Sequence, residues 1–560
     1  GNGRWLNDQI SSLSSGGFTQ SGGTVDLTAP GESGWAICGG PECTNYRGGT
    51  SDVQLFGGTS QSAPLTAGAA ALVIQAYRST HGGDSPSPAR VKHLLTSTAS
   101  DLGLPTFEQG AGLLDARAAV EAALTSPGAK KAPKGLSSNI LVDKSQVSLS
   151  GTPGSTQTAS LAVRNVGTKK LSVAVSTRDL RATAVSTKTT AIDASSSQTF
   201  PYATTGAPWV FKKVTFTVPK STDRLVTAAI WQGAARAVGK ATVTPVVRVS
   251  LFTPDGSFAT NSRPQGGPVS ANYANLDVRK PAAGTWTAVL YTPAGATGYT
   301  GDVTLQTTAQ QAIRVGSVNH KTLKLKAGQS KSVKVKLTMP SSAGDIARAI
   351  TLSTKGHQTA VPVVQRAVVP VSGGAGSFKG TITGGNARAG SAAQVFTYAF
   401  DVPAGTPDLG AGVTLADDAG IRLEGVLVDP NSETQSIGTN AYTDAAGTAV
   451  TSQGRTMQLS TAHPVPGRWR IVVLVINPVT GKELGEKFSG TLRFGQAKVR
   501  TDGVPVSTGT ALPQGQTTTA RVTVTNTGIA PINVQLDART DTVHNTPLTS
   551  PFGPQNFQLP

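Results

Sequence analysis

Ser60 stands in a segment whose residue types suit nucleophilic chemistry, Gly57–Pro64, which reads Gly-Gly-Thr-Ser-Gln-Ser-Ala-Pro. The two glycines allow a tight backbone turn, from which a hydroxyl can project into a cleft. An apolar run follows at once and predicts a helix over 63–77 that is buried on nearly all sides. The start of such a helix presents unpaired N–H groups and a positive dipole end, which suit a developing oxyanion. The alternative is that Ser60 only caps the helix, as serine often does.

Cys38 and Cys43 are the only two cysteines of the 560-residue chain, and Gly-Gly-Pro-Glu separates them. Because these four residues can bend back on themselves, the pair predicts a local disulfide and an oxidising compartment. Two free thiols are the alternative. A metal pair is disfavoured, since no further Cys or His lies nearby.

The nucleophile segment and its neighbours resemble one family. Gly58-Thr59-Ser60-x-x-Ala63-Pro64 resembles the motif around the nucleophile of subtilisin-like serine proteases (S8, or subtilases), commonly Gly-Thr-Ser-Met-Ala-x-Pro. Gln61 and Ser62 replace the usual Met and Ala, so that Ser62 is a second hydroxyl close by. Four more blocks resemble the family in order and spacing: Ser11–Gly17, Val25–Gly31, Val91–Ala99 and Gly110–Val120.

The resemblance implies a secreted serine endopeptidase that cleaves protein or peptide substrates, with Ser60 as the catalytic nucleophile. In subtilases the triad Asp and His precede the Ser, yet residues 1–59 contain no His. All six histidines follow: His81, His93, His320, His357, His463 and His544. We expect His93, which lies in a structural block of the family, to be a surface or packing residue.

An oxyanion-hole Asn is not found either. Asn2, in Gly-Asn-Gly, lies only about ten residues before the Ser11 block, too few to span the intervening strand and loop. We therefore expect the chain to be a fragment that lacks the triad Asp and His and this Asn. Cut at its front and at its back, it would be close to inactive by itself.

Short alternating strands dominate from about residue 139, after a stretch rich in Pro, Gly and Lys, and predict β-sandwiches. Two motifs recur. Asn165-Val166-Gly167 ends one strand and Asn526-Thr527-Gly528 another, and Pro-x-x-Gly-x-Trp or its variant ends at Trp286 and Trp469. The repeats favour alternating Ig-like and jelly-roll-like sandwiches.

The predicted fold class is therefore multidomain, with a truncated α/β subtilisin-like domain followed by several all-β sandwiches of Ig/Fn3-like and jelly-roll-like type. The expected boundaries are: 1–127, the C-terminal part of the peptidase domain; 128–138, a linker; 139–204, an Ig/Fn3-like segment; 205–309, a jelly-roll-like sandwich; 310–375, an Ig/Fn3-like sandwich; 376–495, a jelly-roll-like sandwich; and 496–560, an incomplete Ig/Fn3-like sandwich.

The net charge of +18 is placed unevenly, since residues 1–127 hold 6 Lys and Arg against 10 Asp and Glu. The basic excess belongs to the strand-rich part. It suits acidic polymers, although a generic basic surface is the preferred interpretation. We expect no nucleic-acid partner, because no binding motif occurs, and no membrane span, because no run of 18 apolar residues exists. A cell-surface polymer remains open as a partner of the sandwiches.

Other candidate sites are weaker. Asp417-Asp418 and Asp541 lack the spaced oxygen ligands of a calcium loop, so no cofactor is predicted and no motif supports calcium. Trp286 and Trp469 could stack on sugars, but we expect them in sandwich cores. The alternative function is a surface adhesion, scaffold or glycan-binding protein with a degenerate protease domain.

Overall fold

The structure is a computed structural model that describes most of the chain between residues 9 and 527. Its gaps are 12–13, 32–33, 40–42, 44–50, 131–132, 134–135, 137–138, 204, 233–235, 240, 244, 263–271, 384–391, 444–449, 477–483, 504–516 and 518. Asn2, Asp541, His544 and most of the expected sandwich over 496–560 lie outside the described residues.

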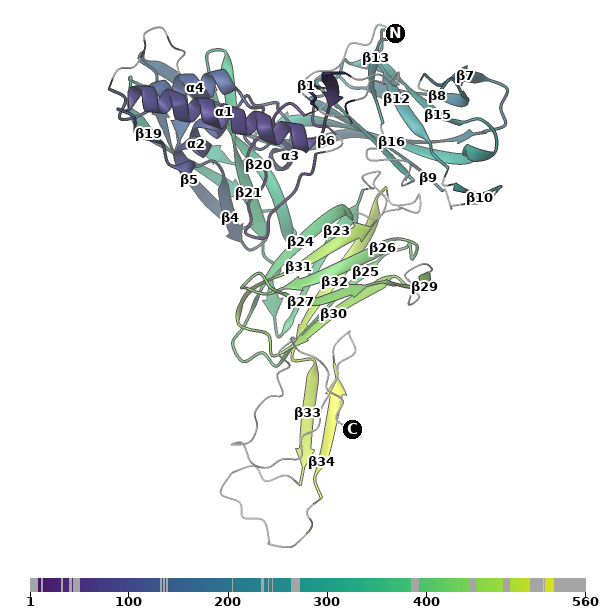
Figure 1. The fold of residues 1–560 in the computed structure, drawn as a ribbon. Helices are drawn as coiled ribbons and strands as arrows, with labels where there is room; N and C mark the ends of the chain where they lie inside the picture. Colours follow the sequence, from purple (N-terminus) through teal and green to yellow (C-terminus); the bar gives the residue numbers. More distant parts are fainter. Residues whose placement is uncertain are drawn as a thin grey trace.

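The first part of the chain forms four helices and a hairpin (Figure 1). Their bounds are α1 Thr59–Thr80, α2 Pro88–Thr98, α3 Thr106–Gln109, α4 Ala116–Leu124, β1 Gly34–Ile37 and β2 Val53–Phe56. Helix α2 begins with residue types that favour a helix start: Ser87 accepts a hydrogen bond from the Arg90 N–H (3.2 Å), and Pro88 occupies the first turn. Helix α1 begins four residues before the predicted Ala63, so Ser60 lies inside its first turn.

Helix α1 is buried on one face only, which differs from the expectation of burial on nearly all sides. Its buried residues are Ala69, Val73, Ala76 and Thr80. Leu65 and Leu72, on another face, keep 46% and 51% of their surface exposed. An apolar helix is buried on every face only where other elements pack on every side of it. Here α2 and α4 cover a single face of α1.

The first two-sheet unit, called the first unit, combines two distant parts of the chain around one core. Its smaller sheet has the order β17-β19-β5-β3, and its strands on the larger sheet are β6, β20, β21, β4 and β18. The bounds are β3 Ile140–Val142, β4 Val147–Gly151, β5 Thr156–Asn165, β6 Leu171–Ile192, β17 Ser317–Val318, β18 Thr322–Leu325, β19 Ser330–Thr338, β20 Gly344–Thr354 and β21 His357–Ala367. The segments 139–204 and 310–375, expected as two units, thus share a single core.

The second unit is inserted between those two segments. Strands β6 and β16 run on from the first unit into it, paired over most of the length of β16. Its own sheet has the order β13-β12-β15-β8-β7. The bounds are β7 Thr199–Pro201, β8 Pro208–Val218, β9 Arg224–Trp231, β10 Arg236–Val238, β11 Ala241–Val243, β12 Arg248–Phe252, β13 Phe258–Asn261, β14 Tyr273–Arg279, β15 Gly284–Pro293, the short η1 Gly295–Thr297 and β16 Gly301–Ile313.

The third unit encloses its own core between sheets of order β22-β23-β32-β25-β30 and β24-β31-β26-β27. The bounds are β22 Val371–Ser372, β23 Ala375–Ile382, β24 Ala392–Val402, β25 Asp408–Leu415, β26 Arg422–Val428, β27 Thr434–Thr439, β28 Ala441–Thr443, β29 Val450–Gln453, β30 Thr456–Ala462, β31 Gly467–Ile476 and β32 Glu486–Phe494. Beyond it β33 Ala497–Asp502 pairs with β34 Arg521–Asn526 (Figure 1).

The two tryptophan motifs occupy equivalent places in the second and third units. Trp286 and Trp469 are 0% and 1% exposed, near the starts of β15 and β31. Each indole N–H donates to a carbonyl four residues earlier, at 2.8 and 2.7 Å. Both side chains therefore belong to the cores, as expected, and are not free to stack on sugars.

The helical part and the first unit share a hydrophobic core, although a linker was expected between them. Leu141 and Val166 of the first unit are buried together with residues of α1, α2 and α4. Backbone and side chain also join the parts, since the Ser97 hydroxyl accepts from the Val142 N–H (3.0 Å) and His357 Nε2 contacts the Thr98 carbonyl (3.0 Å).

A buried ion pair reinforces this junction. Asp101 follows α2, its side chain is fully buried, and it forms a two-point pair with Arg178 of β6. Burial alone would raise the pKa of Asp101, but Arg178 and the amides of Gln109 and Gln358 hold its pKa below the usual value. The pair therefore keeps both charges in a site that water does not reach.

Three more arginines connect the helical part to the β units. Arg224 of β9 lies between Asp277 and Glu108 of α3, with Nη2 at 2.8 Å from Glu108 Oε2. Arg366 of the first unit and Arg470 of the third both donate to the Gln20 carbonyl, at 2.8 and 2.9 Å. All three units thus contact the helical part of the chain, to which Ser60 belongs.

We predict that Asp101→Asn lowers the free energy of unfolding by about 3–5 kcal/mol at pH 7, because it leaves Arg178 buried without an anionic partner. The folded pKa of Asp101 lies below its unfolded value, so its contribution is complete above about pH 4 and is lost as the pH falls through the folded pKa. Urea unfolding should show the difference from wild type shrinking below about pH 4. The exposed Asp84→Asn is the control, and equal stability of both variants at pH 7 would contradict the prediction.

Candidate active site

The turn before α1 is anchored to the segment that ends at Gly31. Gly58 adopts a positive φ of 102°, a region that favours glycine, and its N–H donates to the Gly31 carbonyl at 2.5 Å. The Gly58 carbonyl in turn accepts from the Gln61 N–H (3.0 Å). Two sequence blocks that lie about 30 residues apart therefore meet at the start of α1.

Ser62 has a structural role in this contact. Its hydroxyl donates to the Ala29 carbonyl at 2.9 Å, with the Pro30 carbonyl at 3.2 Å. A side chain at Gly31 would collide with this hydroxyl and would lie 2.8 Å from the Gly58 carbonyl. The hydroxyl of Ser62 is therefore already used, and the backbone of Gly31 must pass close to it.

Ser60 differs from Ser62 in its exposure and in its hydrogen bonding. It is exposed, and its hydroxyl makes no hydrogen bond within the part of the chain that the structure describes. As the second residue of α1, its N–H is among the first four of the helix, which have no partner within it. Ser60 thus combines a free hydroxyl with a nearby backbone donor and the positive end of the helix dipole.

No histidine among the described residues is placed to act as a base for Ser60. His81, at the other end of α1, is buried, stacks on Tyr77 and lies about 32 Å along the helix from Ser60. His93 faces the first unit from α2, where burial and the charge of Arg90 lower its pKa. His357 contacts the Thr98 carbonyl, and His320 and His463 belong to the first and third units.

Gln61 packs on the β1–β2 hairpin. This residue replaces the usual Met of the subtilase motif. A side chain at Gly34 would collide with the Gln61 amide. The Oε1 atom of Gln61 is buried without a hydrogen-bond partner among the described residues. The lack of a side chain at Gly34 was the one sequence signal that could have indicated this close approach.

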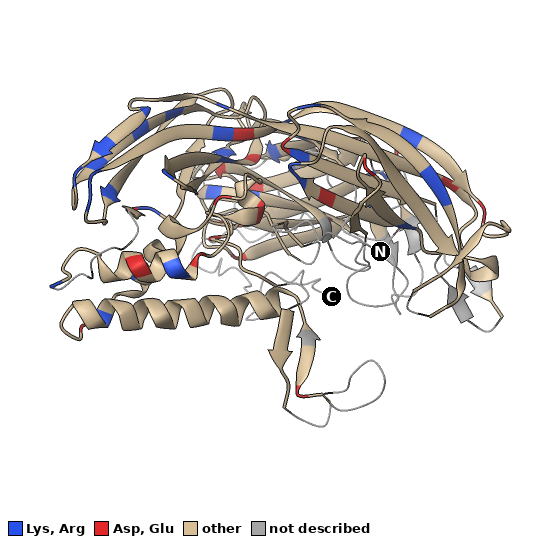
Figure 2. Cartoon of the chain, turned by 90° about the horizontal axis from the view of Figure 1, so that it is seen from above, with Lys and Arg blue, Asp and Glu red and all other residues tan. Residues whose placement is uncertain are grey.

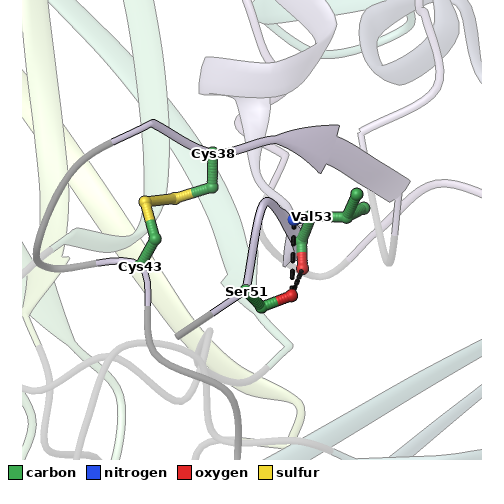
Figure 3. Close-up of a disulfide and its surroundings, with 4 residues drawn as sticks. All are labelled: Cys38, Cys43, Ser51 and Val53. Carbon is green, nitrogen blue, oxygen red and sulfur yellow. Dashed lines mark hydrogen bonds between the residues drawn. A yellow bond between two sulfur atoms is a disulfide. The ribbon is translucent and has the colours of Figure 1, made fainter. Parts of the chain in front are cut away.

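The predicted disulfide is confirmed and closes the β1–β2 connection (Figure 3). Cys38 and Cys43 have Cα atoms 5.8 Å apart. The Cys38 N–H donates to the Asp52 carbonyl (2.8 Å) and the Ser51 N–H to the Cys43 carbonyl (2.9 Å). The bridge therefore holds together a loop that leads directly into the strand before Ser60.

The hairpin and α1 expose large apolar side chains. Trp35 and Ile37 of β1 are 70% and 92% exposed, and Phe56 of β2 and Leu72 of α1 are about half exposed. Ile37 pairs with the exposed Val53 of β2, on the same face as Trp35, and an exposed apolar face of this kind is typical of a surface that packs against another element.

No other site emerges from the described residues. Groups of three or more Cys, His, Asp or Glu side chains suited to a metal are absent from them. Asp418 accepts from the Gly420 N–H (2.8 Å), and the N–H groups of Asp417 and Asp418 donate to Glu486. These aspartates form a local turn. None of the helices described is both long and apolar enough to cross a membrane.

We predict that Gly31→Ala loosens the start of α1, because the added methyl group meets the Ser62 hydroxyl and the Gly58 carbonyl. Hydrogen exchange of the first amides of α1 should speed up by about 10-fold or more, which corresponds to about 1–3 kcal/mol of overpacking. Adding Ser62→Ala should restore part of the protection, since the carbonyl still remains. Gly68→Ala, where nothing lies within 4 Å, is the control and should slow exchange. Unchanged exchange in Gly31→Ala would show that the close approach is absent.

Comparison with known proteins identifies the family of the first part of the chain. Residues 5–113 match the model of the subtilase family, peptidase S8. A search of curated proteins finds no match. Among solved structures, the secreted serine protease VesC from Vibrio cholerae is 7% identical over 62% of this chain and 49% of that chain, with a TM-score of 0.18. Tripeptidyl peptidase 2 is 11% identical over 83% of this chain and 42% of that chain, with a TM-score of 0.15.

The chain thus spans less than half the length of these two structures, and TM-scores at this level do not establish a shared fold. The family assignment rests on the matched sequence, which contains the Ser60 turn, the Gly31 segment and helices α1 and α2. Residues 5–113 of this chain thus match the subtilase family of serine proteases, and this match covers about the first fifth of the chain.

Proposed function

We propose that the parent protein is a secreted subtilisin-like serine endopeptidase and that Ser60 is its nucleophile. The observation that carries the proposal is the contrast between two neighbouring serines. The Ser62 hydroxyl is bound to backbone carbonyls, whereas Ser60 is exposed at the helix start and its hydroxyl has no partner among the described residues.

The chemistry follows from this placement. The Ser60 oxygen attacks the carbonyl carbon of a peptide bond, and its proton passes to a histidine base, which then protonates the leaving amine. The Ser60 N–H and the dipole of α1 stabilise the oxyanion of the tetrahedral intermediate. Water then hydrolyses the acyl-enzyme and regenerates the hydroxyl.

The base, its orienting Asp and the oxyanion Asn are supplied, in this proposal, by a segment that precedes these residues in the parent protein. Two observations support such a segment. Among the described histidines, His81 and His357 are bound to backbone carbonyls and none forms a hydrogen bond with Ser60, and the exposed apolar side chains of α1 and the hairpin need a cover. The disulfide fits the oxidising compartment of a secreted protein.

The two-sheet units would be accessory sandwiches, Ig/Fn3-like for the first and jelly-roll-like for the second and third. Their equivalent tryptophans support a repeated fold for the last two. The alternative, a surface scaffold with a degenerate protease domain, is favoured by the lack of a base near Ser60 among the described residues, and the following experiment separates the two.

We predict that a fluorophosphonate probe labels the parent protein, because an activated serine oxygen displaces the fluoride and becomes phosphonylated. Ser60→Ala should abolish the labelling. Ser62→Ala is the matched control and should retain at least a tenth of it, since it loses only a supporting hydrogen bond. The 560-residue chain alone should remain unlabelled, because no histidine of its described part forms a hydrogen bond with Ser60.

Labelling that persists in Ser60→Ala would refute the assignment of the nucleophile. Parent protein that folds but takes up no probe would favour the scaffold alternative.

A further inference from the structure

Asn165 joins two turns at one end of the first unit. Its side chain is fully buried, and Nδ2 donates to the carbonyl oxygens of Lys169, Leu325 and Lys326 at 2.8, 3.2 and 3.2 Å. Its backbone also bonds to the 326–329 turn through N–H and carbonyl. One buried amide therefore holds together two turns that lie 160 residues apart along the chain.

Six cations lie on these turns or on the strand ends beside them, and we call this set the cationic tip: Arg164, Lys169, Lys170, Lys324, Lys326 and Lys331. Strand register brings them together, because Ser330 pairs with Arg164 and Lys324 with Ser172. The five lysines are exposed and Arg164 is half-buried. None of the six has an ion-pair partner among the described residues.

The chain around the cationic tip carries little compensating charge. Asp143, which follows β3, accepts from the Ala162 N–H of β5 (2.7 Å) and is the acidic residue beside the cationic tip. Residues 144–178 and 303–344 contain no Asp or Glu. Figure 2 shows blue segments without red ones on the strands at that end of the molecule, whereas red segments gather near the middle. A group of like charges with few counter-charges produces a positive potential that attracts anions.

The residue types of the cationic tip indicate the kind of anion. Five of the six are lysines, whose compact ammonium groups bind phosphate as point charges and do not require the fixed planar geometry of an arginine fork. The turns and strand ends that form the tip, 164–172 and 322–332, contain no aromatic residue on which bases or sugar rings could stack. Lys324 and Lys326 are two residues apart, about 7 Å along an extended chain, which suits a row of anionic groups.

We propose that the cationic tip is a docking surface for a linear polymer of phosphate groups, recognised by its charge and not by bases or sugars. The surface is independent of the proposed role of Ser60. It would hold the protein on a phosphate-rich surface through the first unit.

The test is binding of the whole 560-residue chain to inorganic polyphosphate, measured by titration between 50 and 200 mM salt. Neutralisation of about six charges predicts an affinity loss of roughly 100-fold or more over this range. The triple variant Lys169→Gln/Lys170→Gln/Lys326→Gln should weaken binding at least 10-fold and flatten the salt dependence. The matched control changes three exposed lysines elsewhere, Lys212→Gln/Lys213→Gln/Lys487→Gln, and has the same net charge.

Strong loss in the tip variant with little change in the control supports the proposal. Equal loss in both variants would show that only net charge matters, and absence of binding by the wild type would also overturn it. Hyaluronate and single-stranded DNA are comparison ligands at equal charge. Equal affinity for the carboxylate polymer would refute the preference for phosphate, and much tighter binding of DNA would indicate a nucleic-acid partner instead.

Discussion

Buried arginines hold the helical part of this chain to its β units. Each of them needs a carboxylate partner, because its charge is out of water. Arg178, Arg224 and Arg366 are each about nine-tenths buried, and each is paired with at least one acidic side chain. A buried guanidinium without its carboxylate lowers the stability of the fold, so each arginine and its partner have to stay in contact. Because Asp101 and Glu108 come from the segment after α2, the pairs fix that segment against two units at once.

This constraint reaches the proposed nucleophile through α1. Helix α1 packs on α2 and α4, and α2 in turn packs on β3 and β21 of the first unit. The start of α1 is held separately by the Gly31 segment, through the Gly58 N–H and the Ser62 hydroxyl. Ser60 therefore lies on a turn that these contacts support, while one side of the helix stays exposed.

Local sequence chemistry predicted the features that depend on neighbouring residues. Ser87 and Pro88 start α2 because a hydroxyl can cap the N–H of Arg90 and proline needs no partner there. The short glycine-containing stretch between Cys38 and Cys43 allowed their bridge, and the apolar strands after Trp286 and Trp469 placed both indoles in cores. The motif favours Ser60 over Ser62 as the proposed nucleophile. The hydrogen bonds of the Ser62 hydroxyl to backbone carbonyls support the same choice.

The sequence by itself determined the strand-rich character of the chain, the start of α2, the disulfide and the segment that contains Ser60, because each depends on contacts within a few residues. Only the tertiary structure decided that 139–204 and 310–375 form one core, since strand β5 of the first segment pairs with strand β19 of the second. It also decided that α1 leaves Leu65 and Leu72 exposed and that Asn165 joins two distant turns. Pairings across more than a hundred residues depend on which strands become neighbours, and local residue patterns do not specify that choice.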